Sequence, residues 1–298
     1  METRSPLIAA TDFSGPARHA VDRAALLAAQ TGLTLTLMHA IPAGRVAELQ
    51  QWLGSSPPEA LLHDEVRVQL QELADELRAE RSADVRTMHT VGDVTECILI
   101  EASTLDAALI VVGASGAGFL RRFVPGTTAE RLLRRSARPV LLVRREPQER
   151  YRRVLVAIDF SPVSALLLET ARRWAPQAQL VLLHAFEVPF ASRLHLAGID
   201  DATMEHYRQF VRSEASRRLN EMARAAGLDE GAYEARVVEG DASRCIVQHE
   251  QEEDGDLVVL GKHGQSVVED LLLGSVTLHV LSEGGTDVLV CAEPQRQV

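Results

Sequence analysis

Residues 10–14, Ala-Thr-Asp-Phe-Ser, return later in the chain as residues 157–161, Ala-Ile-Asp-Phe-Ser. Later landmarks repeat at a constant offset of 148 residues: Gly92, Gly113 and Gly126 correspond to Gly240, Gly261 and Gly274. Chance matches would favour the commoner Leu and Ala, so matching glycines indicate a true internal repeat. The 298 residues therefore contain one sequence unit twice. We expect two domains, 1–150 and 151–298, with the boundary in a polar, arginine-rich stretch near Arg150.

Short apolar runs alternate with amphipathic segments in each copy, which is typical of βαβ units. The expected strands are 7–10, 33–39, 85–90, 108–112 and 140–143 in the first copy, and 154–158, 180–184, 235–238, 257–260 and 288–291 in the second. Apolar residues spaced by three and four in 62–77 and 211–226 predict a helix in each copy. Continuously apolar strands favour parallel pairing with both faces covered. We predict an α/β fold with two tandem, doubly wound, five-stranded parallel sheets.

Composition excludes several classes of function. The formal net charge of −11 argues against a general nucleic-acid binder and against binding to anionic membranes. We find no export signal and no apolar run near the roughly 18 residues of a membrane span. The three cysteines contain no C-x-x-C pair, which argues against a disulfide framework or a cysteine zinc site. We therefore expect a cytoplasmic protein.

The most specific motif follows the fourth expected strand of each copy. Gly113-Ala-Ser-Gly116, nine residues and Gly126-Thr127 return as Gly261-Lys-His-Gly264, nine residues and Gly274-Ser275. Glycines permit positive φ and let a ligand approach the main chain closely. The helix that follows presents free N–H groups and the positive end of its dipole to an anion, and Thr127 or Ser275 adds a hydroxyl. The motif predicts a site for a phosphate chain, although glycines that only form turns would give the same pattern.

In each copy an aspartate follows the first expected strand and a histidine ends the second. Asp12 and Asp159 lie at the same sheet edge as the glycine motif and could accept hydrogen bonds from ribose hydroxyls, or could instead be helix N-caps. His39 and His184 end the second strands, and we expect hydrogen-bonded structural histidines there. No partner with metal-ligand spacing accompanies them, so no metal site is expected from protein side chains.

At these residues the chain resembles the nucleotide-binding type of the universal stress protein family, in its tandem form. The family motif Gly-x2-Gly-x9-Gly-[Ser/Thr] is complete in both copies, and the resemblance covers nearly all of the chain. It implies a Rossmann-like fold that binds ATP, ADP or AMP with Mg²⁺. Phosphates would lie on the glycine loop, ribose near the first-strand aspartate and adenine against the main chain after the second strand. The candidate nucleotide-binding residues are Ala10, Asp12, Ala40, Ile41, Gly113, Ser115, Gly116, Arg121, Arg122, Gly126, Thr127 and Thr128 in the first copy, and Ala157, Asp159, Ala185, Gly261, Lys262, Gly264, Gly274, Ser275 and Val276 in the second.

The two copies differ in charge. Arg121-Arg122 in the first nine-residue insert correspond to Glu269-Asp270 in the second. Residues 1–150 carry a net charge of −2 and residues 151–298 carry −9. Cations favour a triphosphate and carboxylates repel it, so we expect the first copy to be the tighter site. Lys262, the only lysine of the chain, is either a phosphate ligand or a consequence of arginine-rich composition.

These features predict an adenine-nucleotide-binding regulatory protein of the stress response. The chain has neither a Walker A sequence nor a nucleophile elbow, so we do not expect an enzyme. The alternatives are a nucleotide-free interaction or scaffold protein of the same fold and a nucleotide hydrolase or transferase. The resemblance also implies pairing through fifth strands, which a tandem chain can satisfy internally as a pseudo-dimer; a homodimer and an unknown protein partner remain open.

Overall fold

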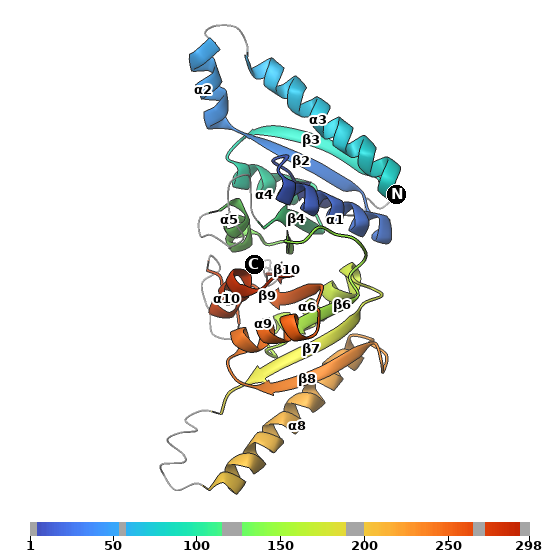
Figure 1. Ribbon diagram of the computed structural model, residues 1–298, viewed down its shortest axis with the longest axis vertical. Coiled ribbons are helices and arrows are strands. Elements are labelled where there is room, and N and C mark those ends of the chain that lie inside the picture. Colours follow the sequence, from blue (N-terminus) through green and yellow to red (C-terminus); the bar gives the residue numbers. More distant parts are fainter. Residues whose placement is uncertain (1–4, 54–57, 115–126, 189–199, 265–271, 293–298) are drawn as a thin grey trace. The chain divides into compact units, whose positions relative to one another are not determined.

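The computed structural model describes residues 5–53, 58–114, 127–188, 200–264 and 272–292 (Figure 1). The chain forms two compact units. The first contains the chain up to Arg150 together with the chain from Thr286 onward, and the second is built mainly from Tyr151–Gly285. Each of the ten expected strands is present within the described residues.

The first unit is a doubly wound α/β fold. Its elements are β1 (Leu7–Ala10), α1 (Gly15–Thr31), β2 (Leu35–Pro42), α2 (Ala43–Leu53), α3 (Pro58–Arg81), β3 (Val85–Gly92), α4 (Val94–Thr104), β4 (Leu109–Gly113), α5 (Thr128–Arg135), β5 (Val140–Val143) and β10 (Asp287–Cys291). The strand order is β3-β2-β1-β4-β5-β10. β1 is parallel to both β2 and β4, and β4 is parallel to β5. Because the winding reverses at β1, the carboxyl ends of β1 and β4 flank a crevice where such folds bind ligands.

β10 is the last strand of the second sequence repeat but belongs to the first unit. It pairs antiparallel with β5, with Val288 opposite Leu142 and Val290 opposite Val140. Every residue of both strands is buried, and an apolar strand of this kind is an aggregation hazard if its edge is left unpaired. The expected pairing of the two fifth strands therefore occurs within one chain. The boundaries of the sequence repeats and of the compact units therefore differ, because β10 belongs to the second repeat but to the first unit.

The second unit repeats the same winding. Its elements are β6 (Arg153–Ala157), α6 (Val163–Trp174), β7 (Gln179–Phe186), α8 (Asp201–Ala225), β8 (Tyr233–Glu239), α9 (Ala242–Glu252), β9 (Leu257–Gly261) and α10 (Ser275–Glu283). The strand order is β9-β6-β7-β8, and all of these pairs are parallel. The tandem α/β fold expected from the sequence is confirmed.

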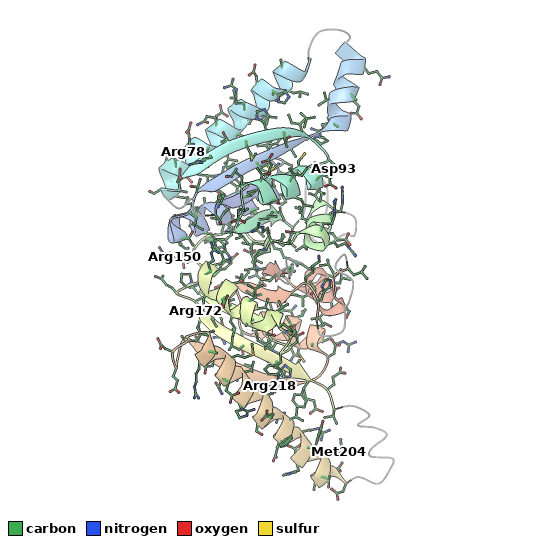
Figure 2. All side chains as sticks on the ribbon, turned by 180° about the vertical axis from the view of Figure 1, so that it is seen from behind. Arg78, Asp93, Arg150, Arg172, Met204 and Arg218 are labelled. Carbon is green, nitrogen blue, oxygen red and sulfur yellow. The ribbon has the colours of Figure 1, made fainter. Side chains whose placement is uncertain are left out.

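Apolar periodicity accounts for the helices that cover these sheets. Leu70 and Leu77 of α3 are 1% and 0% exposed, and Leu219 of α8 is 0% exposed. Figure 1 shows α3 along β3 and α8 along β8, and their contacts agree with this placement. In the second unit Met204, labelled in Figure 2, is buried near the N-terminus of α8 and forms a core cluster with Phe186 and Val188.

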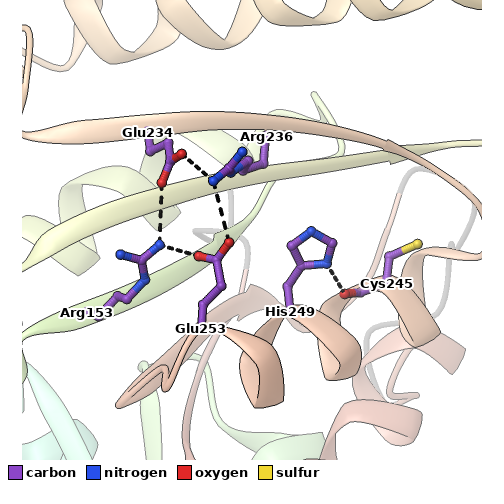
Figure 3. Close-up of polar contacts among 6 residues, drawn as sticks. All are labelled: Arg153, Glu234, Arg236, Cys245, His249 and Glu253. Atoms are coloured by element: carbon purple, nitrogen blue, oxygen red, sulfur yellow. Dashed lines mark hydrogen bonds and ion pairs between the residues drawn. The ribbon is translucent and has the colours of Figure 1, made fainter.

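A cluster of ion pairs in the second unit connects the start of β6 with β8 and with the residue that follows α9. The Arg153 guanidinium contacts the carboxylates of Glu253 and Glu234, and its Nη2 lies 3.4 Å from Glu234 Oε2 (Figure 3). Arg236 Nη2 lies 2.5 Å from Glu234 and 3.7 Å from Glu253. These side chains are partly exposed, so each pair contributes no more than about 1 kcal/mol. Among the described residues, no helix combines the length and the apolar character that crossing a membrane requires.

Candidate functional site

The first unit has a cavity where the carboxyl ends of its parallel strands meet the N-terminus of α5. The cavity volume is about 520 Å³, which lies within the roughly 300–1,000 Å³ typical of small-molecule pockets. The described residues that line it are Ala10, Thr11, Asp12, Ala17, His39, Ala40, Pro42, Arg45, Val94, Ile98, Val112, Gly113, Ala114, Thr127, Thr128 and Ala129. Its walls therefore come from β1 and the loop that follows it, from β2 and β4, and from the N-terminal parts of α1, α2, α4 and α5.

Six of the candidate residues of the first copy share this cavity. They are Ala10, Asp12, Ala40, Gly113, Thr127 and Thr128. Ile41 does not line it, and its side chain is buried in β2 at 3% exposure. The remaining candidates, Ser115, Gly116, Arg121, Arg122 and Gly126, lie outside the described residues.

Thr127 makes the start of α5 suitable for an anion. It is the N-cap of the helix, and its Oγ1 accepts a hydrogen bond of 3.3 Å from the Glu130 amide. The hydroxyl proton can therefore be donated to a ligand. The first N–H groups of a helix have no acceptor within it and carry the positive end of the dipole. Ala129 and Leu132, 6% and 0% exposed, anchor the helix in the core as expected.

Asp12 is fixed against the cavity wall by its own loop. Its Oδ1 accepts hydrogen bonds from the Ser14 amide at 3.0 Å and the Ser14 hydroxyl at 2.5 Å. Ser14 in turn caps α1 by accepting from the Ala17 amide at 3.3 Å. The N-cap interpretation therefore applies to Ser14 and not to Asp12. The Asp12 carboxylate instead closes the turn between β1 and α1 and lines the cavity.

Three polar residues that line this cavity, Thr11, His39 and Arg45, were not predicted as site residues. His39 is hydrogen-bonded to the main chain as expected, with its Nδ1 2.7 Å from the Thr11 carbonyl oxygen, but it also lines the cavity. Burial lowers its pKa, and the nearby Arg45 adds to this effect while Asp12 opposes it. Arg45, at the start of α2, supplies a cation. The signal available in the sequence was the position of Arg45 just after the second strand.

Gly113 is needed for close packing. Gly113, Gly261 and Gly264 do not adopt the positive φ that glycine permits. A Cβ at Gly113 would lie 2.7 Å from the Pro16 carbonyl oxygen. Glycine is thus required at position 113 because the end of β4 packs directly against the first turn of α1.

The second unit has a smaller cavity at the equivalent place. Its volume is about 170 Å³. The lining residues are Ala157, Ile158, Asp159, Ser161, Val163, Leu167, Leu183, Ala185, Ala242, Ile246, Leu260, Gly261, His263, Gly264, Gly274, Ser275, Val276 and Thr277. Eight of the nine candidates in this copy are therefore brought together. The exception is Lys262, which is 7% exposed and does not line the cavity.

In the second unit, some main-chain groups of the glycine motif already form hydrogen bonds within the protein. The Gly274 amide donates to the Lys262 carbonyl oxygen at 2.9 Å, and Thr277 Oγ1 donates to the Gly261 carbonyl at 2.8 Å. Asp159 Oδ1 accepts from the Ser161 amide at 2.9 Å and the Ser164 hydroxyl at 3.0 Å. The Gly274 amide, which we expected to face an anion, is therefore engaged in an internal hydrogen bond.

Fold and cavities together define a repeated, doubly wound α/β protein with a cavity at the carboxyl ends of the strands in each unit. The model of the universal stress protein family matches residues 4–144 and 150–292. The chain belongs to the universal stress protein family.

Individual relatives agree with this assignment. A universal stress protein of Mycobacterium tuberculosis is 32% identical over 198 residues, and the match spans 63% of this chain and 63% of that protein. A second one from the same organism is 29% identical over 306 residues, covering 96% of each. The crystal structure of a universal stress protein from Archaeoglobus fulgidus has a TM-score of 0.70 at 18% identity, covering 98% of this chain and 99% of that one, and supports the fold.

Proposed function

We propose that the first unit binds an adenine nucleotide, ATP, and that the chain is a regulatory stress protein rather than an enzyme. The observation that carries the proposal is one cavity that joins Asp12, the N-terminus of α5 and the main chain at the carboxyl end of β2. Phosphates fit the amides and hydroxyl at Thr127, because helix N-termini bind anions. Asp12 would accept from ribose hydroxyls. Adenine would lie against the main chain at Ala40.

The arrangement of charges in this cavity suits an anionic ligand. Arg45 lines it, and the helix dipole of α5 points its positive end toward it. Mg²⁺ would enter with the triphosphate, whose hard oxygens it prefers. The two nucleotide-bearing walls, the β1 loop and the α5 start, come from segments separated by more than a hundred residues. The cavity is therefore a product of the fold and not of one local motif.

We assign the nucleotide to the first unit in preference to the second. The first cavity is about 520 Å³ and the second about 170 Å³, below the usual range for small-molecule pockets. The Gly274 amide is engaged by Lys262, and most of the negative charge of the chain lies in residues 151–298. These observations favour the nucleotide-free alternative for the second unit, whose glycine loop would then be structural.

Matched aspartate variants test the proposal. Asp12→Asn keeps an oxygen that can accept from Ser14 but removes the carboxylate charge from the first cavity, and Asp159→Asn makes the same change in the second. Nucleotide released by denaturing extraction should amount to about one per chain. Titration calorimetry with ATP and Mg²⁺ should show roughly tenfold weaker binding for Asp12→Asn, the size expected for one lost hydrogen bond to a charged group.

Asp159→Asn should bind ATP with the affinity of the unaltered chain. Absence of binding at millimolar ATP with Mg²⁺ would refute the proposed function. Equal losses in the two variants would instead show that the second unit also holds nucleotide.

A further inference from the structure

The loop before α1 contains an aromatic residue in an unusual backbone conformation, and the second copy repeats it. Phe13 has φ 62° and Phe160 has φ 61°. A bulky L-residue rarely adopts positive φ, and such strain persists only where the surroundings impose it. Each phenylalanine directly follows the aspartate that lines the cavity of its unit. The conformation therefore lies next to the candidate ribose-binding carboxylate in both copies.

A histidine from the neighbouring strand holds each strained loop. The Phe13 and His39 rings are stacked, with centroids 4.8 Å apart and planes at 27°. Phe160 also packs on His184, with centroids 4.4 Å apart, but there the rings are tilted, with planes at 44°. His39 Nδ1 lies 2.7 Å from the Thr11 carbonyl oxygen, and His184 Nδ1 lies 2.8 Å from the Ile158 carbonyl oxygen. A carbonyl oxygen only accepts, so Nδ1 is the donor in each case.

In the first unit, His39 contacts the residues on both sides of Asp12 in the sequence. The imidazole fixes the carbonyl of the residue before Asp12 by a hydrogen bond and the side chain of the residue after it by stacking. The Phe13 amide also donates to Thr11 Oγ1 at 3.0 Å, which closes the turn from the other side. Thr11, Asp12 and His39 all line the first cavity. His39 and Phe13 therefore hold the loop on both sides of Asp12, and the hydrogen bonds from Ser14 orient the carboxylate itself.

We propose that His39 and Phe13 are positioning residues that hold Asp12 where it accepts from the ribose hydroxyls of the nucleotide. This inference rests on the proposed function and adds a specificity for ribonucleotides. His39 acts through the loop and needs no contact with the ligand. In the second unit the Arg218 guanidinium, labelled in Figure 2, covers Phe160 at 4.0 Å from the ring centroid, so that loop has an additional support.

The test compares two substitutions of His39 in the full chain. In His39→Asn the side-chain amide can take the place of Nδ1 and donate to Thr11, whereas His39→Leu cannot donate. Affinities for ATP and for 2′,3′-dideoxy-ATP, which lacks both ribose hydroxyls, are measured by calorimetry with Mg²⁺. His39→Leu should weaken ATP binding roughly tenfold, leave dideoxy-ATP binding unchanged and be largely rescued in His39→Asn. His184→Leu, the matched control in the second unit, should leave both affinities unchanged.

Two further variants keep the test decisive. Phe13→Gly removes the stacked ring and the demand for positive φ while leaving His39 in place, and it should cause the same selective loss of ATP binding. The double variant His39→Leu, Asp12→Asn should bind ATP no more weakly than Asp12→Asn alone, because both changes remove one interaction.

Three outcomes overturn the positioning role alone: unchanged ATP affinity in His39→Leu, equal loss for ATP and dideoxy-ATP, or additive losses in the double variant. Absence of ATP binding by the unaltered chain overturns the proposed function itself, and this role with it.

Discussion

A pair of histidines distinguishes the two copies at the residue scale. His89 on β3 lies beside His39 in register, and its Nε2 is 2.9 Å from Nδ1 of His63 on α3. Burial lowers the pKa of His89, and the neighbouring His63, His39 and Arg67 lower it further. In the second unit the residue in register with His184 is Val237, which packs on an apolar cluster. The first unit therefore has a proton-sensitive contact where the second has a hydrophobic one.

The lowered pKa of His89 predicts that stability falls on acidification. In the unfolded chain His89 titrates near its usual value of about 6.5, and in the folded chain below it. Below pH 6.5 the unfolded state therefore binds more protons, and the free energy of unfolding decreases as pH falls toward the folded pKa. His89→Val, which copies Val237, should reduce the difference in urea midpoint between pH 7.5 and pH 5.5. His39 and His184, whose pKa values burial also lowers, would keep part of it. An unaltered difference would contradict the prediction.

At the scale of elements, a buried carboxylate anchors the start of β10. Asp287 Oδ1 accepts from the Arg144 amide at 2.8 Å and the Arg145 amide at 3.3 Å. Its Oδ2 lies 3.4 Å from Arg23 Nε on α1, and the two side chains are only 2% and 8% exposed. The corresponding residue before β5 is Pro139. The two fifth strands therefore begin differently. β10 begins at an aspartate that forms an ion pair with Arg23 of α1, whereas a proline precedes β5.

Removing that carboxylate should destabilise the first unit strongly. Asp287→Ala removes a buried carboxylate that pairs with the Arg23 guanidinium and accepts from two amides. Loss of one partner of a buried pair costs roughly 3–5 kcal/mol. Guanidinium chloride unfolding should show a decrease of this size, and Arg23→Met combined with Asp287→Leu should recover much of it. A loss below about 1 kcal/mol for Asp287→Ala would show that the ion pair contributes little.

At the scale of the whole molecule, the first unit depends on a strand from the far end of the chain. We propose 1–150 and 151–298 as the domains of the sequence, although β10 completes the sheet of the first unit. A fragment of residues 1–150 would expose the edge of β5, whose residues Val140–Val143 are all buried in the chain. Exposed apolar edges pair with other chains.

The fragment 1–150 should therefore self-associate through β5. Sedimentation should show dimers or larger species, and Leu141→Lys should reduce them by placing a charge on the edge strand. A monomeric fragment with native far-ultraviolet circular dichroism would show that β10 is not needed to satisfy this edge.

Several site residues could be predicted from sequence because their signals are local. Asp12 follows a continuous apolar strand, and Thr127 follows a glycine at the start of a helical pattern, so both fall at the same sheet edge in any doubly wound fold. Lys262 shows the limit of that reasoning. Its position in the motif left a phosphate role open, but the residue is buried and does not line the cavity, and its carbonyl oxygen accepts from the Gly274 amide. Side-chain direction depends on packing that spacing does not encode.

The sequence by itself determined the internal repeat, the ten strands and the glycine spacing, because each depends on residue type and periodicity over short stretches. The tertiary structure alone decided that β10 belongs to the first compact unit, that His39 and Arg45 line the first cavity and that the two cavities differ in volume. These features arise from contacts between residues far apart in the chain, such as Thr11 with His39 and Arg23 with Asp287. Such contacts depend on how helices and strands pack in three dimensions, and local patterns carry no direct record of that packing.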